Sequence, residues 1–189
     1  MLWLWILVGA LVLLALLAIY GYNRLVRLRN EVDTGWANID VQLQRRADLI
    51  PNLVEAVRGY AAHERAVFDE VTRARAALQQ ASTPGSAADA NEGLTAAIGR
   101  LFAVAEAYPE LKASENFLQL QDDLTDTEDK ISAARRYYNA TVMRFNTAVQ
   151  SVPWLLLAKP FGFREREFFS AQGDVSVPEV AFSGGPPAS

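Results

Sequence analysis

Residues 36–60, WANIDVQLQRRADLIPNLVEAVRGY, carry apolar side chains at the spacing of an α-helix. The apolar positions are Trp36, Ile39, Leu43, Ile50, Leu53, Val57 and Tyr60. Their steps alternate between three and four residues, except where Arg46 interrupts the series. Because an α-helix has about 3.6 residues per turn, these side chains fall on one face. The stretch therefore predicts an amphipathic helix that packs against other helices.

The same period continues on both sides of this stretch and returns later in the chain. It begins at Leu25, and further runs occupy residues 94–108 and 117–148. Additional apolar residues such as Val41 widen the stripe, which favours a packed bundle over a two-stranded coiled coil. No useful length of the sequence alternates with the period of two that marks a strand. We therefore predict a mainly α chain with an antiparallel up-and-down helical bundle over residues 24–152.

Two prolines leave the number of helices open. Residues 82–86, STPGS, form a clear loop, whereas Pro51 and Pro109 each interrupt a periodic run. If both prolines lie in turns, the bundle has four antiparallel helices. If both are kinks, the chain forms one long hairpin. A three-helix arrangement would leave the last helix about 20 Å longer than its neighbour, so we favour four helices with Pro51 in a turn.

The N-terminal segment has the composition of a membrane span. Residues 1–23 contain no charged side chain. About 21 helical residues cross the roughly 30 Å hydrocarbon core of a bilayer. A cleaved signal sequence would begin with basic residues and end at a small-x-small site, and this segment has neither. We therefore predict a retained transmembrane anchor over residues 1–23. Its aromatic residues stand near both ends, as at membrane interfaces: Trp3, Trp5, Tyr20 and Tyr22.

Three arginines follow the anchor directly and predict its orientation. They are Arg24, Arg27 and Arg29. Basic residues are enriched on the cytoplasmic side of membrane spans. We therefore expect a single-pass protein with its N-terminus outside and the bundle in the cytoplasm. The same arginines are expected to attract anionic lipid headgroups.

The last segment, residues 153–189, begins with a short apolar stretch. Residues 153–163, PWLLLAKPFGF, are too few to span a bilayer and include two prolines. Their side chains need cover, so the stretch caps the bundle, enters the membrane interface or binds a partner. We favour the cap among these three and predict a disordered tail after the stretch. The candidate partner contacts are Trp154, Leu155, Leu156, Phe161 and Phe163.

Motifs for several kinds of chemistry are missing from the sequence. The chain has no cysteine, which excludes disulfide scaffolds, thiol nucleophiles and iron–sulfur sites. Its one histidine, His63, cannot supply the paired histidines of a zinc protease or a di-iron bundle. The acidic residues from Asp122 to Asp129 lack the glycine of a calcium loop. We predict no catalytic residue, no metal or cofactor, no nucleic-acid binding and no small-molecule substrate.

Two long motifs resemble the LemA family of bacterial membrane proteins. The first covers residues 22–30, YNRLVRLRN, and residues 36–64, WANIDVQLQRRADLIPNLVEAVRGYAAHE. The second covers residues 108–146, with YPELKASENFLQLQ, TEDKISAARRYYN and a later FN. The resemblance implies a helical bundle on one N-terminal span in the bacterial inner membrane, with no established catalytic residue. It also implies a relationship to a branch that is associated with shaping internal membranes in magnetosome-forming bacteria.

These observations favour a membrane-anchored scaffold or adaptor over an enzyme. Its expected partners are the lipid bilayer and either another protein or further copies of the chain. A membrane-shaping, self-assembling protein is one alternative. A hydrolase that uses carboxylates between Asp122 and Asp129 is another, and it would need one carboxyl group with a raised pKa.

Overall fold

The computed structural model describes residues 1–171, and all regular structure within them is helical. This confirms the predicted mainly α fold. Disorder was predicted for the tail after residue 163, but residues 164–171 are ordered by hydrogen bonds to α5. The rest of that tail, residues 172–189, lies outside the described residues. The helices are α1 (Leu2–Arg58), α2 (Arg65–Gln80), α3 (Pro84–Ala105), α4 (Pro109–Lys112), α5 (Glu115–Gln150) and α6 (Leu155–Ala158).

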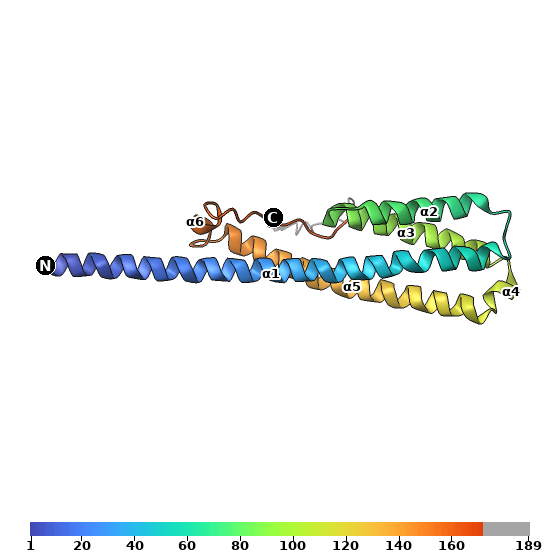
Figure 1. Cartoon of the computed structure of the whole chain (residues 1–189), viewed down its shortest axis with the longest axis horizontal. Coiled ribbons are helices and arrows are strands. Elements are labelled where there is room, and N and C mark those ends of the chain that lie inside the picture. Colours follow the sequence, from blue (N-terminus) through green and yellow to red (C-terminus); the bar gives the residue numbers. More distant parts are fainter. Residues whose placement is uncertain (172–189) are drawn as a thin grey trace, which may run out of the picture.

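α1 is one helix that begins in the predicted anchor and ends at the far tip of the bundle (Figure 1). At about 1.5 Å per residue, its 57 residues extend roughly 85 Å. Its first part projects beyond all the other helices and is exposed along its length. That part contains an 18-residue window with a mean hydropathy of 2.8 and no buried residue, which is apolar enough to cross a membrane.

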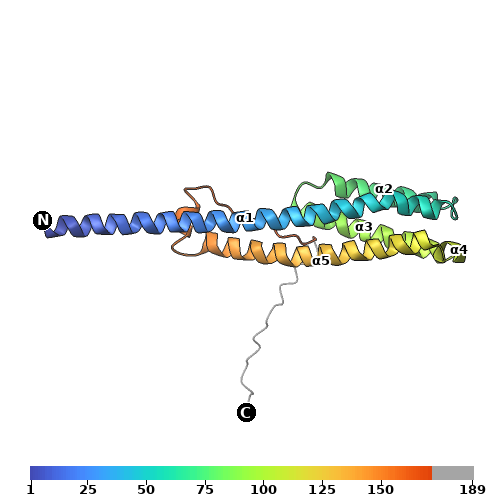
Figure 2. The same ribbon diagram turned by 60° about the horizontal axis from the view of Figure 1, so that its bottom comes forward.

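The four long helices run up and down in the order α1, α2, α3, α5 (Figures 1 and 2). The α2–α3 hairpin packs beside the half of the α1–α5 pair that is far from the anchor. α3 has 22 residues and α5 has 36, so α5 is longer by about 21 Å. Over the half nearer the anchor, the described chain therefore places no third long helix beside α1 and α5.

The core follows one stripe along α1 and the facing sides of its neighbours. Gly35 lies where α1 and α5 approach closely, since a methyl group there would stand 3.3 Å from the Cα atom of Tyr138. The stripe on α1 consists of Leu25, Val32, Ile39, Leu43, Ile50, Leu53 and Val57, all buried. Buried residues of α5 include Leu124, Ile131, Tyr138, Val142 and Phe145.

Pro51 lies inside α1, so the prediction of a turn at Pro51 is wrong. A proline within a helix has no N–H to offer the carbonyl group four residues earlier, here that of Ala47. In this structure Arg75 of α2 takes that place: its Nε donates to the Ala47 carbonyl oxygen at 2.8 Å. Because a neighbouring helix satisfies the freed acceptor, α1 continues past the proline to Arg58.

The turns between helices lie at other positions than Pro51, and the bundle has the predicted four long helices, α1, α2, α3 and α5. α1 and α2 are joined by residues 59–64, beyond Pro51. The predicted loop at 82–86 is partly helical, because Thr83 caps α3 and forms a reciprocal capping box with Ser86. Pro109 opens the short helix α4 in the turn before α5, as expected for a proline in a turn.

Candidate functional site

The predicted anchor ends where α1 meets the rest of the molecule. Trp3 and Trp5 are exposed near its start, and Tyr20 and Tyr22 are exposed near its end. Trp3 and Tyr22 are 19 residues apart, or about 28 Å along a helix, close to the thickness of the hydrocarbon core. The spacing of these aromatic rings is thus compatible with the predicted positions at two membrane interfaces. The exposed arginines that follow are Arg24, Arg27 and Arg29.

The chain folds back onto this exit point after α5. Residues 152–163, which we call the platform, include α6 and pack against the end of the anchor. The Trp154 ring lies 5.8 Å from the Tyr20 ring, measured between centroids. It also covers Gly21, where a methyl group would overlap the indole. Glycine at this position thus lets the platform seat directly on α1.

Phe163, at the end of the platform, is only 6% exposed. Its ring packs at 5.8 Å from Tyr22 and 6.5 Å from Phe145, and the Arg29 guanidinium lies over it at 5.6 Å. The side chain of Phe163 belongs to the core of this chain, which does not favour the partner contact predicted for it. Its inner position agrees with the predicted cap at this end of the bundle.

The other predicted contact residues lie closer to the surface. Trp154 and Leu155 are half-buried. Leu156 and Phe161 are 71% and 58% exposed, and Val152 beside them is 76% exposed. The platform thus has an inner side that covers the bundle and an outer side with large apolar groups.

The platform continues into an extended segment, residues 164–171, which we call the strap. Asn146 of α5 holds it at Arg166: the amide Nδ2 donates to the carbonyl oxygen at 2.9 Å, and Oδ1 accepts from the backbone N–H at 2.8 Å. Asn139 holds Phe169 in the same way, at 3.1 and 2.9 Å. Each asparagine thus pairs with both backbone groups of one strap residue.

The spacing of these two contacts follows from backbone geometry. Asn139 and Asn146 are seven residues apart, which is about 10.5 Å along α5. Arg166 and Phe169 are three residues apart, which is about 10 Å in extended chain. The two repeats coincide, so an extended segment antiparallel to α5 meets both asparagines. Since both contacts are to the main chain, they place no demand on the side chains of the strap.

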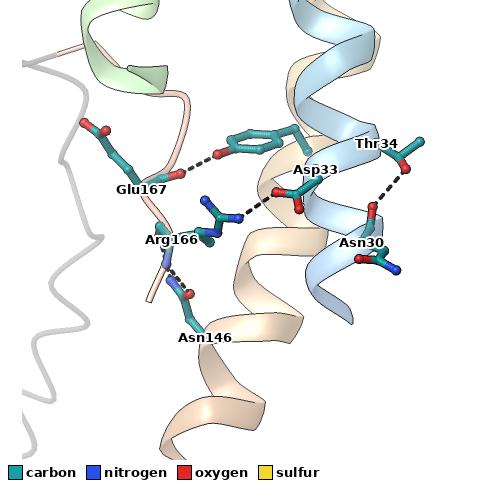
Figure 3. A network of polar contacts seen from close by, with 7 residues as sticks. Asn30, Asp33, Thr34, Asn146, Arg166 and Glu167 are labelled. Atoms are coloured by element: carbon teal, nitrogen blue, oxygen red, sulfur yellow. Dashed lines mark hydrogen bonds and ion pairs between the residues drawn. The ribbon is translucent and has the colours of Figure 1, made fainter. Parts of the chain in front are cut away.

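Further contacts fix the strap to the part of the α1–α5 pair that lacks a third helix. Figure 3 shows the side chain of Arg166 pointing from the strap toward Asp33 of α1, where the guanidinium pairs with the carboxylate at 2.7 Å. The Tyr138 hydroxyl donates to the Glu167 carbonyl oxygen at 2.8 Å. Burial raises the pKa of Tyr138 to about 12. Phe169 is buried, so the strap completes the core where the α2–α3 hairpin ends.

Sequence reasoning missed Asn139 and Asn146, although the signal is present. An aromatic residue precedes each of them, and the pairs Tyr138-Asn139 and Phe145-Asn146 repeat at seven residues. The aromatic side chain of each pair is buried in the core. The asparagine that follows it stands at the edge of the core, where it can reach a neighbouring backbone.

Residues 35–182 match the family model described as the LemA family. The chain belongs to the LemA family. This confirms the resemblance seen in its motifs. The matched range includes the last 24 residues of α1, the other helices, the platform and the strap.

Named relatives of this LemA-family chain come from several bacteria. It is 28% identical over 184 residues to the Magnetosome protein MamQ of Magnetospirillum gryphiswaldense, covering 82% of this chain and 68% of the relative. The Magnetosome protein MamQ 2 of Paramagnetospirillum magneticum gives the same values. The Protein LemA of Metamycoplasma hominis is 27% identical over 128 residues, covering 67% of this chain and 58% of the relative.

Two of the acidic residues between Asp122 and Asp129, Asp126 and Glu128, form ion pairs in this LemA-family structure. Asp126 accepts a hydrogen bond from Lys130 at 2.7 Å and lies 3.7 Å from Arg45. The Lys130 hydrogen bond lowers the pKa of Asp126. A general acid at neutral pH requires the opposite shift. Among residues 1–171, no group of three or more acidic or histidine side chains is placed to hold a metal ion.

Arg46, which interrupts the apolar series of α1, is buried between three helices. Its Nη1 donates to Asn91 Oδ1 of α3 at 2.7 Å and lies 2.6 Å from Glu128 Oε2 of α5. Burial lowers the pKa of Arg46, and the nearby Glu128 opposes that effect. An arginine in the core is stable only with such partners. The LemA-family bundle therefore contains one polar layer that favours a specific alignment of α1, α3 and α5.

Proposed function

We propose that this chain is a membrane-anchored scaffold that holds protein partners, or further copies of itself, at the cytoplasmic face of a bacterial membrane. The continuity of α1 carries this proposal. A helix without a break from the apolar segment to the tip at Arg58 couples the bundle rigidly to the anchor. A flexible linker would be expected if the anchor served only to localise the bundle.

The proposal assigns no catalytic role to the chain. The ion pairs of Asp126 and Glu128 support this, because a carboxylate that faces a cation is suited to structural pairing. A second candidate is a membrane-shaping protein that assembles with itself. The names of the MamQ relatives support it, since they are magnetosome proteins.

Cysteine labelling tests the proposed orientation. The chain has no cysteine of its own, so a single Asn52→Cys variant reports one exposed position near the tip. We expect a membrane-impermeant maleimide to label Asn52→Cys only after the cells are permeabilised. Labelling in intact cells would place the bundle outside the cytoplasm and contradict this part of the proposal.

Photo-crosslinking in cells tests the scaffold role. A benzophenone amino acid is placed at Val41 or Met143, which are 61% and 58% exposed on α1 and α5. Asp122, also exposed, carries the same group in a control variant. We expect a discrete crosslinked product, either with this chain or with one other protein, from at least one of the apolar positions. A chain that yields only its monomer at both positions, and purifies from mild detergent as a monomer, would refute a scaffold.

A further inference from the structure

Three exposed apolar side chains of the platform lie beside the end of the apolar N-terminal part of α1. Val152, Leu156 and Phe161 are 76%, 71% and 58% exposed. The Phe161 ring also lies 5.1 Å from the Tyr22 ring, so the outer side of the platform is level with the end of the anchor. Single exposed apolar residues are common, but three on one short segment call for a surface that covers them.

Basic side chains predominate at this end of the molecule, and the nearest acidic residues along the chain are Glu31 and Glu165. Residues 1–30 and 145–164 contain five basic side chains and no acidic one. The rest of the chain has 13 basic and 22 acidic residues. Positive charge is thus concentrated beside the exposed apolar groups, in the arrangement that attracts anionic lipid. The basic residues are Arg24, Arg27, Arg29, Lys159 and Arg164.

We propose that the platform is a second membrane-docking surface. It places Val152, Leu156 and Phe161 in the interface of the leaflet in which the anchor ends, with Lys159 among lipid phosphates. The proposal rests on the proposed anchoring of α1 in a membrane. The lipid surface is the occupant because the platform is continuous with the apolar helix, through the contact of Trp154 with Tyr20. Aromatic and apolar side chains flanked by cations are typical of interfacial segments.

A second attachment would restrict how the bundle moves. A single span leaves a rigid rod free to turn about its own axis and to tilt. The platform follows α5, so it stands to one side of the α1 axis. Docking at that point fixes the rotation of the bundle about the α1 axis.

Depth-dependent fluorescence quenching tests the proposal on the full-length chain. Single cysteines are introduced as Leu156→Cys and Phe161→Cys and labelled with an environment-sensitive fluorophore. The labelled chains are placed in vesicles of phosphatidylcholine and phosphatidylglycerol that contain lipid spin-labelled near the headgroup. Tyr20→Cys reports the anchor itself. Val41→Cys is the matched control, since it is 61% exposed but about 28 Å along α1 from Tyr22.

We expect quenching at positions 156 and 161 to approach that at position 20, and to exceed that at position 41 about fivefold. Strong quenching at position 20 with none above the control at 156 and 161 would overturn the platform proposal and leave the anchor intact. Weak quenching at position 20 as well would overturn the anchoring and the proposed function with it. A blue-shifted fluorophore at 156 that lipid does not quench would show cover by protein, which also overturns the proposal.

A substitution of Lys159 tests the proposal independently, because it changes the charge of the platform without changing its packing against α1. The Lys159 side chain is exposed, so Lys159→Gln leaves the contacts of the platform unchanged. We expect this substitution to lower the ratio of docked to undocked platform about fivefold in vesicles with phosphatidylglycerol. In vesicles of phosphatidylcholine alone it should have no effect. Equal quenching of the two chains in both lipids would refute the role given to Lys159.

Discussion

Replacing Arg75 should destabilise the bundle only because Pro51 is present. Arg75 Nε donates to the Ala47 carbonyl oxygen at 2.8 Å, in a partly buried position. A hydrogen bond from a charged donor contributes about 1.5 to 3 kcal/mol. Arg75→Met keeps most of the aliphatic stem but removes the donor. We therefore expect it to lower the free energy of unfolding by about 1.5 to 3 kcal/mol in the natural background.

The same substitution should cost much less when residue 51 can donate. In Pro51→Ala the restored N–H reaches the Ala47 carbonyl, as in an ordinary helix. Arg75→Met in that background should cost roughly 0.5 kcal/mol or less, which gives a coupling energy of at least about 1 kcal/mol. Pro51→Ala alone should not destabilise the chain, because proline disfavours a helix interior by about 3 kcal/mol.

Urea unfolding of the four full-length chains in detergent, followed by circular dichroism at 222 nm, measures this cycle. Arg73→Met is the control, because Arg73 is exposed on the same helix. It should change the free energy of unfolding by no more than about 0.5 kcal/mol. If Arg75→Met costs the same with proline and with alanine at position 51, the freed carbonyl is not what holds Arg75.

Three further predictions concern the strap and the polar layer. Asn139→Ala removes two hydrogen bonds worth about 1 kcal/mol each, so the backbone amide of Phe169 should exchange its hydrogen about 30-fold faster, as measured by NMR. An unchanged exchange rate would refute the role of Asn139 in holding the strap. Because its pKa is raised to about 12 in the folded state, Tyr138 contributes stability that is complete below about pH 10 and lost between about pH 10 and 12. Melting temperatures should show this loss in the natural chain and not in Tyr138→Phe, and parallel curves would contradict it. Glu128→Gln leaves the buried Arg46 without its counter-charge and should cost about 1 to 3 kcal/mol in urea unfolding; a change below about 0.5 kcal/mol would show that Asn91 and water suffice.

Local sequence patterns were enough to predict the helices, because the apolar period that marks a helix can be seen within a short stretch of sequence. The apolar N-terminal helix and the buried side of Val32, Ile39 and Leu53 follow from residue types and spacing within a turn or two, and the up-and-down order follows from the breaks between the helical runs. The LemA family also follows from continuous motifs.

Features that depend on distant partners could not be predicted in this way. Pro51 looked like a turn because the residue that satisfies Ala47 is 28 positions away. Whether Phe163 caps the bundle or contacts a partner stayed open in the sequence, because the residue that covers it, Tyr22 of α1, is far away along the chain. The sequence of the strap has no apolar period that would predict its position. Two asparagine side chains on α5 hold its backbone, and such contacts leave no pattern in the side chains of the strap.

The unbroken α1 has a mechanical consequence. The 35 residues from Arg24 to Arg58 form an arm of about 52 Å beyond the apolar segment. When a span is longer than the bilayer around it, it tilts to match the local thickness. A tilt of about 10° about the point where α1 leaves the bilayer, near Arg24, would move the far end of the arm sideways by about 9 Å. Such an arm converts a small difference in bilayer thickness into a displacement of nearly one helix diameter at its tip.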